Sequence, residues 1–179
     1  MNQKKQTNQS SESTKTYEVI FMPLGIFFLS AFYLLYFCKY NFKIADEGIP
    51  LNGALRILRG ETPWVDFYGY APGRYMFYSQ LFEWFGEDLM VPRRAIALLT
   101  AVATTLVFIA CRYVMSVTFA LTAALLFLAA PGVYYGRYTA IFFSIAAYLA
   151  VCYLRENKFA SFLLGFVAGI AYLFRTDLG

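Results

Sequence analysis

Histidine is absent from this chain and charged residues are scarce, and both shortages narrow what the protein can be. Without histidine, catalysis by an imidazole and metal binding by an imidazole are excluded within these 179 residues. Only 15% of the residues are charged, whereas about a quarter are charged in an ordinary globular domain. In addition, 60% are apolar and 20% aromatic, more than a soluble domain of this length could bury. This composition excludes a water-soluble domain and a disordered chain.

Cysteine is also rare, and the net charge is small. Cys38, Cys111 and Cys152 each stand alone in an apolar run, and their spacing matches no zinc or redox motif. We therefore exclude a secreted disulfide scaffold and expect all three to be small apolar packing residues. The net charge of +4 is too small and too scattered to indicate a nucleic-acid partner.

Long uncharged runs dominate the rest of the sequence. A membrane-spanning helix needs about 20 apolar residues to cross roughly 30 Å of hydrocarbon. Only Arg112 separates the second and third runs, so a tight turn over 112–116 is expected, because one continuous helix would be far too long for a bilayer. The predicted fold class is all-α, a polytopic membrane protein with about five transmembrane helices, at 19–38, 95–112, 116–130, 138–154 and 159–174.

Basic residues near these runs predict the orientation in the cell membrane, because cytoplasmic segments are enriched in Lys and Arg. One side would carry Lys4, Lys5, Lys15, Arg112, Arg155 and Lys158, and the short segments on the other side only Arg137 and Arg175. The N-terminus is therefore predicted to be cytoplasmic. The polar residues 1–17 are predicted to be a disordered tail and 18–179 to form a transmembrane domain.

The loop predicted outside, residues 39–94, is long and patterned. Apolar residues recur at helical spacing over 50–59, which indicates an amphipathic helix on the membrane surface, ended by Gly60. A second helix is predicted over 76–85, ended by Gly86. Seven Trp and Tyr side chains suit the headgroup layer: Tyr40, Trp64, Tyr68, Tyr70, Tyr75, Tyr78 and Trp84.

Acidic residues in this loop are the candidates for chemistry. Asp46 and Glu47 precede the predicted surface helix, where they could serve a site or simply cap the helix. Asp66 could contact a substrate or stabilise a turn. Three further acids are expected to be solvated rim charges: Glu83, Glu87 and Asp88.

The end of the chain gives a second signal. Gly165 and Gly169, with Ala168, are predicted to allow close helix packing. The helix then leads into Arg175 and Asp177, predicted to emerge on the same outer side as Asp46. These two residues could be ordinary flanking charges, or the Arg175 guanidinium could bind a phosphate.

In order and spacing, these segments resemble the GT-C membrane glycosyltransferases, in particular the branch related to protein O-mannosyltransferases and the lipid A aminoarabinose transferase. The resemblance covers about 19–179 and is most specific over 46–94 and 165–179. It is carried by Asp46-Glu47-Gly48, Gly60, Pro63-Trp64-Val65-Asp66-Phe67, Pro72-Gly73, Gly165 to Gly169 and Phe174 to Gly179. Arg74 departs from the pattern, since relatives often have a small residue there.

This resemblance implies a longer enzyme, of which the chain would be the N-terminal part, truncated. It implies transfer of a sugar from a polyprenyl- or dolichyl-phosphate donor to an acceptor hydroxyl at the outer membrane face. By resemblance, Asp46 is the candidate base, and Glu47 would orient it or help to bind acceptor or metal. Arg175, Asp177 and Asp66 are candidate substrate-binding residues. A divalent metal is possible, although nothing in the sequence requires one.

Two other functions remain open at this stage. A transporter or flippase part would place ionisable residues inside its spans, whereas the predicted spans contain no Asp, Glu, Lys or Arg except Arg112 at the end of the second. A non-enzymatic membrane subunit would not depend on Asp46 for its function.

Overall fold

The computed structural model describes residues 20–40, 42–69, 72–130, 137–155 and 157–174, without the side chains of 44–46 and 137–139. All regular structure in these ranges is helical, which confirms the predicted all-α class. The predicted tail at 1–17 lies outside the described residues. The helices are α2 (Met22–Phe37), α3 (Ile44–Leu58), α4 (Pro72–Phe85), α5 (Met90–Arg112), α6 (Val117–Ala129), α7 (Arg137–Leu154) and α8 (Lys158–Phe174).

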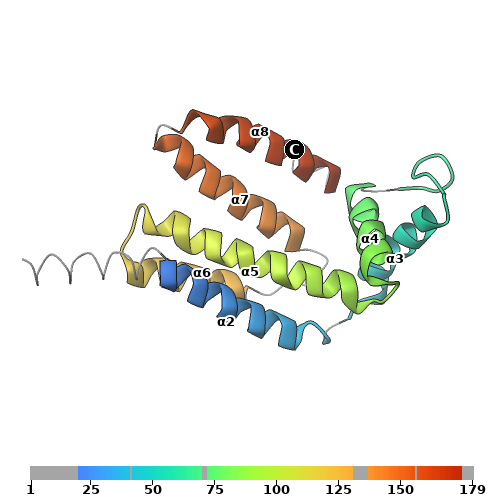
Figure 1. Cartoon of the computed structure of the whole chain (residues 1–179), viewed down its shortest axis with the longest axis horizontal. Helices are drawn as coiled ribbons and strands as arrows, with labels where there is room; N and C mark the ends of the chain where they lie inside the picture. Colours follow the sequence, from blue (N-terminus) through green and yellow to red (C-terminus); the bar gives the residue numbers. More distant parts are fainter. Residues whose placement is uncertain (1–19, 41, 70–71, 131–136, 156, 175–179) are drawn as a thin grey trace, which may run out of the picture.

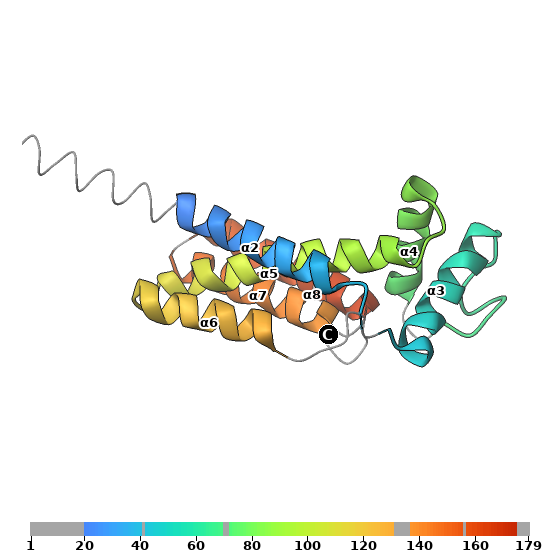
Figure 2. The ribbon, with the colours of Figure 1, turned by 90° about the horizontal axis from the view of Figure 1, so that it is seen from below.

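Five of the helices form a bundle, and the other two lie across one end of it. Helices α2, α5, α6, α7 and α8 run along the long axis, with α3 and α4 gathered at one end (Figures 1 and 2). Helix α5 is central, because it packs against α2, α6, α7 and α4, while α8 packs against α7 and α4. The segment between α2 and α5 is therefore a structured unit attached to one end of the bundle.

The predicted turn after Arg112 is confirmed. The Tyr113 amide donates to the Ala110 oxygen at 3.2 Å and the Met115 amide to the Cys111 oxygen at 2.9 Å, which ends α5. Helix α6 begins at Val117 and returns along α5. One continuous helix through this region is excluded.

The helix predicted at 50–59 begins earlier than expected. Helix α3 starts at Ile44 and contains Pro50 in its interior, so Asp46 and Glu47 lie in its first turn rather than in front of it. The prediction was wrong because proline usually ends or kinks a helix, and α3 tolerates it. The predicted helix ends are confirmed, since Gly60 and Gly86 have φ angles of +88° and +90°, which disfavour other residues.

Only one described helix is both long and apolar enough to cross a membrane, namely α5, Met90–Arg112. Shorter apolar helices accompany it: Met22–Phe37, Val117–Ala129, Ala140–Leu154 and Lys158–Phe174. All five predicted spans are thus helices, whereas their crossing of a membrane stays a prediction.

Small and hydroxyl side chains share the interior of the bundle with larger apolar ones such as Leu34, Ile96 and Phe108. On α5, Ala97, Thr100 and Thr104 are buried, and both threonine hydroxyls donate to a carbonyl one turn earlier in the helix, at 2.7 and 2.9 Å. Large apolar side chains lie outside instead: Phe28, Leu29, Phe32, Phe119, Leu126, Phe143, Phe162 and Phe166 are each more than half exposed. A surface covered by many large apolar side chains is unusual for a soluble helical bundle and is typical of helices packed in lipid.

Candidate functional site

The N-terminal turn of α3 is fixed to the bundle by a buried ion pair. Arg93 on α5 donates from Nε to Glu47 Oε2 at 2.7 Å and from Nη2 to Glu47 Oε1 at 3.0 Å. Glu47 is 4% exposed and Arg93 2% exposed. The geometry is the planar, two-bond pairing that a guanidinium makes with a carboxylate, so the pair fixes direction as well as distance.

Arg93 also binds the end of α2. Its Nη1 donates to the Cys38 carbonyl oxygen and its Nη2 to the Tyr40 oxygen at 3.1 Å. The Phe42 ring lies 5.5 Å from the guanidinium carbon. A positive group at a helix C-terminus satisfies carbonyls that have no partner within the helix. We call this group the α2–α3–α5 joint, composed of Cys38, Tyr40, Phe42, Glu47 and Arg93.

The joint engages the carboxylate of Glu47, for which several roles were predicted. Both carboxylate oxygens are bonded to Arg93, and a buried carboxylate separated from its partner would cost several kcal/mol. The capping alternative is not observed for Glu47, and the N-cap residue of α3, Lys43, makes no side-chain capping bond. Glu47 is thus bonded to Arg93 inside the molecule, and its roles towards Asp46, an acceptor or a metal stay predictions.

Asp46 immediately precedes this joint. Its backbone lies in the first turn of α3, and its side chain is outside the described part of the structure. Because Glu47 and Arg93 immobilise that turn, the position of the Asp46 backbone relative to α5 is fixed. Its assignment as a base stays a prediction.

Asp66 stabilises a turn in the segment between α3 and α4. Its Oδ2 accepts a hydrogen bond from the Thr62 amide at 2.7 Å, and Arg56 Nη2 donates to its carbonyl oxygen at 3.0 Å. Arg56 also pairs with Glu61 and lies 4.4 Å from the centre of the Phe67 ring. Asp66 was predicted either to contact a substrate or to stabilise a turn, and these bonds correspond to the second role.

The beginning of α4 is fixed to the end of α8. Arg74 Nε donates to the Phe174 carbonyl oxygen at 2.9 Å. A Cβ atom on Gly73 would lie 2.8 Å from the Leu173 oxygen, so only glycine allows this approach without a shift. Arg74, the departure from the family pattern, thus supplies a cap for α8. Arg175 and Asp177 lie outside the described residues.

Gly165 and Gly169 do not contribute to helix packing as predicted. A Cβ atom built on either one meets nothing within 4 Å. Helix α8 uses another face, on which Ala160 and Ala171 are buried. The small-residue pattern alone could not indicate which face of α8 would meet α7.

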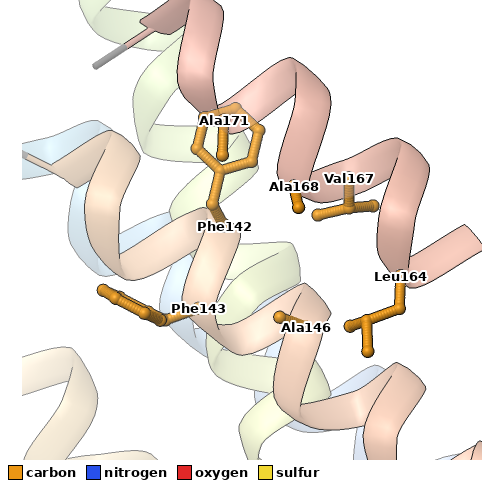
Figure 3. Close-up of a pocket in the computed structure, with 7 residues that line it drawn as sticks. All are labelled: Phe142, Phe143, Ala146, Leu164, Val167, Ala168 and Ala171. Atoms are coloured by element: carbon orange, nitrogen blue, oxygen red, sulfur yellow. The ribbon is translucent and has the colours of Figure 1, made fainter. Parts of the chain in front are cut away.

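The described part of the surface includes two grooves. One, of about 100 Å³, lies between α7 and α8 and carries no charged side chain (Figure 3). It is lined by Phe142, Phe143, Ala146, Leu164, Val167, Ala168 and Ala171. The other, of about 330 Å³, lies between α4 and α5 and is lined by Leu81, Phe85, Val91, Arg94, Ala95 and Leu98.

Arg93 was missed as an individual site residue, because the sequence presents it only as half of an arginine pair before an apolar run. A signal was available in the helical spacing. Arg93 shares a face of α5 with Ala97, Thr100 and Thr104, all buried, whereas Arg94 shares a face with Leu98 and Val102, both exposed.

Among the described side chains, no three His, Cys, Asp or Glu residues gather closely enough to hold a metal ion. Comparison with known proteins found no matching family model, no matching curated protein and no matching solved structure.

Proposed function

We propose that this chain belongs to a multi-pass membrane glycosyltransferase of the GT-C class. It would move a sugar from a polyprenyl- or dolichyl-phosphate donor to an acceptor hydroxyl at the outer face of the cell membrane. Asp46 would act as the base, with Glu47 and Arg93 holding its helix in place.

The membrane location rests on the distribution of side chains. Large apolar residues such as Phe32, Leu126 and Phe162 cover the outside of α2, α6 and α8, with exposed fractions of 73%, 68% and 67%. That surface would be unfavourable in water and favourable in a bilayer. The short helices are compatible with spanning when Lys and Arg side chains extend to the headgroups from their ends.

The observation that carries the function is the contact between Arg74 and Phe174. It draws the Pro72-Gly73 segment against the end of α8, immediately before Arg175. Helix α3, with Asp46 in its first turn, belongs to the same end of the molecule (Figure 2). Two parts of the family resemblance, Pro72-Gly73 and Phe174, therefore meet from distant parts of the chain, which supports the proposal of a shared site at this end.

The proposed sugar transfer requires few chemical groups. A lipid phosphate is already a good leaving group, so the reaction needs a carboxylate to remove the acceptor proton and positive charge near the departing phosphate. The absence of histidine is no obstacle to that mechanism.

The test is sugar transfer in reconstituted vesicles, with the full-length protein and its Asp46→Asn variant, each supplied with a panel of polyprenyl-phosphate sugars and a mixed acceptor extract. We expect transfer by the parent and a loss of about 10²- to 10⁴-fold in the variant, the usual contribution of a general base. Glu83→Asn, an exposed acid on α4, is the control. If the parent transfers no sugar, or if Asp46→Asn transfers as well as the parent, the proposal is wrong, and the second result favours a non-enzymatic subunit.

A further inference from the structure

The seven Trp and Tyr side chains that the sequence predicted in one headgroup layer do not share one environment. Tyr75 and Tyr78 are each only 3% exposed, and the Tyr75 ring lies against Gly53 of α3, so these two are packed inside the molecule instead. Tyr70 lies outside the described residues. The other four are more than half exposed: Tyr40, Trp64, Tyr68 and Trp84.

Tyr40 and Trp84 lie at the level of the first turns of α5, although they come from different segments. Arg93 Nη2 donates to the Tyr40 carbonyl oxygen at 3.1 Å. Phe85 lines the α4–α5 groove together with Arg94, and its ring centre lies 6.4 Å from that of Trp84. The end of α2 and the end of α4 are therefore both level with the beginning of α5.

Two exposed cations lie at the same level. Lys39 Nζ is 5.3 Å from the centre of the Tyr36 ring and 5.2 Å from that of the Tyr40 ring. Arg94, near the beginning of α5, is also exposed. Trp and Tyr favour the headgroup layer of a membrane, and Lys and Arg are attracted to its anionic lipids. We call these side chains the interfacial band: Tyr36, Lys39, Tyr40, Trp84 and Arg94.

The interfacial band borders the apolar surface of the bundle. On α5, Val102 lies about two turns beyond Arg94 and is 43% exposed. On α2, Phe32 lies about one turn before Tyr36 and is 73% exposed. The band therefore separates a surface suited to hydrocarbon from the unit formed by α3 and α4.

Trp64 and Tyr68 belong to a turn beyond the band, which we call the tip, residues 62–68. Figures 1 and 2 share the long axis of the molecule, and in both the segment between α3 and α4 lies further along this axis than the start of α5. The tip has a defined form, because the Trp64 amide donates to the Phe67 oxygen at 2.7 Å and holds Trp64 at a φ of +67°, which a bulky residue rarely adopts.

We infer that the interfacial band binds the headgroup layer of the bilayer and that the tip lies in the water beyond it. A headgroup layer is about 5–8 Å thick, whereas α3 is about 22 Å long, begins at the band where Glu47 is bonded to Arg93, and ends next to the tip. The inference rests on the membrane location in the proposed function and not on sugar transfer. It places the first turn of α3, with the Asp46 backbone, at the headgroup layer.

Two native side chains report on the two levels, because Trp64 and Trp84 are the only tryptophans among these 179 residues. The full-length protein is reconstituted into phosphatidylcholine vesicles as Trp64→Phe, which leaves Trp84, and as Trp84→Phe, which leaves Trp64. Any tryptophan outside these residues is first replaced by phenylalanine. Fluorescence is quenched from the lipid side by phospholipids brominated near the headgroup and from the water by acrylamide. Circular dichroism checks that each variant keeps its helical content.

We expect Trp84 to lose most of its emission to the brominated lipid and little to acrylamide, and Trp64 to show the reverse. In a background without both tryptophans, Tyr40→Trp should behave like Trp84 and Tyr68→Trp like Trp64. Val102→Trp is the hydrocarbon reference, and lipid brominated at the end of the acyl chain should quench it most.

Two outcomes would overturn this inference. If brominated lipid quenches Trp64 as strongly as Trp84, the tip lies on the bilayer, as the sequence predicted. If acrylamide quenches Trp84 as strongly as Trp64, the band lies in water.

Sugar transfer by the same proteins separates this inference from the proposed function. The expected quenching in a protein without transfer would refute the enzyme and leave the membrane contact. Lipid quenching of both tryptophans in a protein that transfers sugar would refute the membrane contact and leave the enzyme.

Discussion

Arg74 donates a hydrogen bond to the main-chain oxygen of Phe174, a residue 100 positions later in the chain. The Phe174 ring lies 5.9 Å from that of Phe77 and 5.3 Å from that of Phe142, so the end of α8 is held between α4 and α7. This contact joins the structured loop to the last helix.

Replacement of Gly73 by alanine should separate α4 from α8. The added methyl group would overlap the Leu173 main chain, and overpacking of this kind costs about 1–3 kcal/mol. Thermal unfolding in detergent should show a lower midpoint. Gly165→Ala is the matched control, because its methyl group meets nothing and alanine is the better helix former by about 1 kcal/mol. Equal midpoints for the two variants would contradict the contact.

Breaking the joint at Glu47 should be strongly destabilising. Glu47→Gln leaves the buried guanidinium without a counter-charge, at a cost of about 3–5 kcal/mol. Arg93→Met should cost more, because the Cys38 and Tyr40 carbonyls also lose their donor. The free energy of unfolding, measured by titration with a denaturing detergent, checks both values.

The double variant Glu47→Gln with Arg93→Met should lose less stability than the sum of the two single changes, since no buried charge remains. Glu83→Gln, at an exposed position, should stay within about 0.5 kcal/mol of the parent. Strict additivity in this cycle would show that the ion pair is not formed.

Asp66 offers a direct choice between its two predicted roles. Asp66→Asn keeps an oxygen that can accept from the Thr62 amide, whereas Asp66→Ala loses it, at about 1 kcal/mol. For a turn residue, only the alanine variant should speed proteolysis of the 59–69 segment, and both variants should retain sugar transfer. A loss of transfer in Asp66→Asn without faster proteolysis would instead support substrate contact.

The orientation can be tested with single cysteines in a cysteine-free background. Met115 lies in the turn between α5 and α6 and Val65 in the segment between α3 and α4, with exposed fractions of 40% and 80%. We expect a membrane-impermeant maleimide applied to intact cells to label Val65→Cys and not Met115→Cys. After permeabilisation both should react. Labelling of both positions in intact cells would exclude the predicted orientation.

The sequence was sufficient for the local features of this fold. Uncharged runs located α2 and α5 to α8, and glycine located the ends of α3 and α4 because a positive φ is a property of a single residue. The sequence misplaced the start of α3. Proline usually ends or kinks a helix, yet α3 continues through Pro50.

The candidate site was only partly predictable. Sequence reasoning singled out Asp46, Glu47 and Asp66 as acids in an unusual loop, and it could not assign a partner to any of them. The partners are Arg93 for Glu47 and Thr62 for Asp66, and the first of these pairings spans 46 residues. The sequence also predicted that Gly165 and Gly169 are packing residues, although α8 presents another face to α7.

The sequence by itself determined that the chain forms helices, carries long uncharged apolar runs and is interrupted by one polar, aromatic-rich segment, because these properties follow from residue type and periodicity. Only the tertiary structure decided that Arg93 turns inward to Glu47 while Arg94 faces a groove, and that Gly73 meets the end of α8. Those outcomes depend on which helices become neighbours. Packing across the whole chain determines this, and the adjacent residues in the sequence do not.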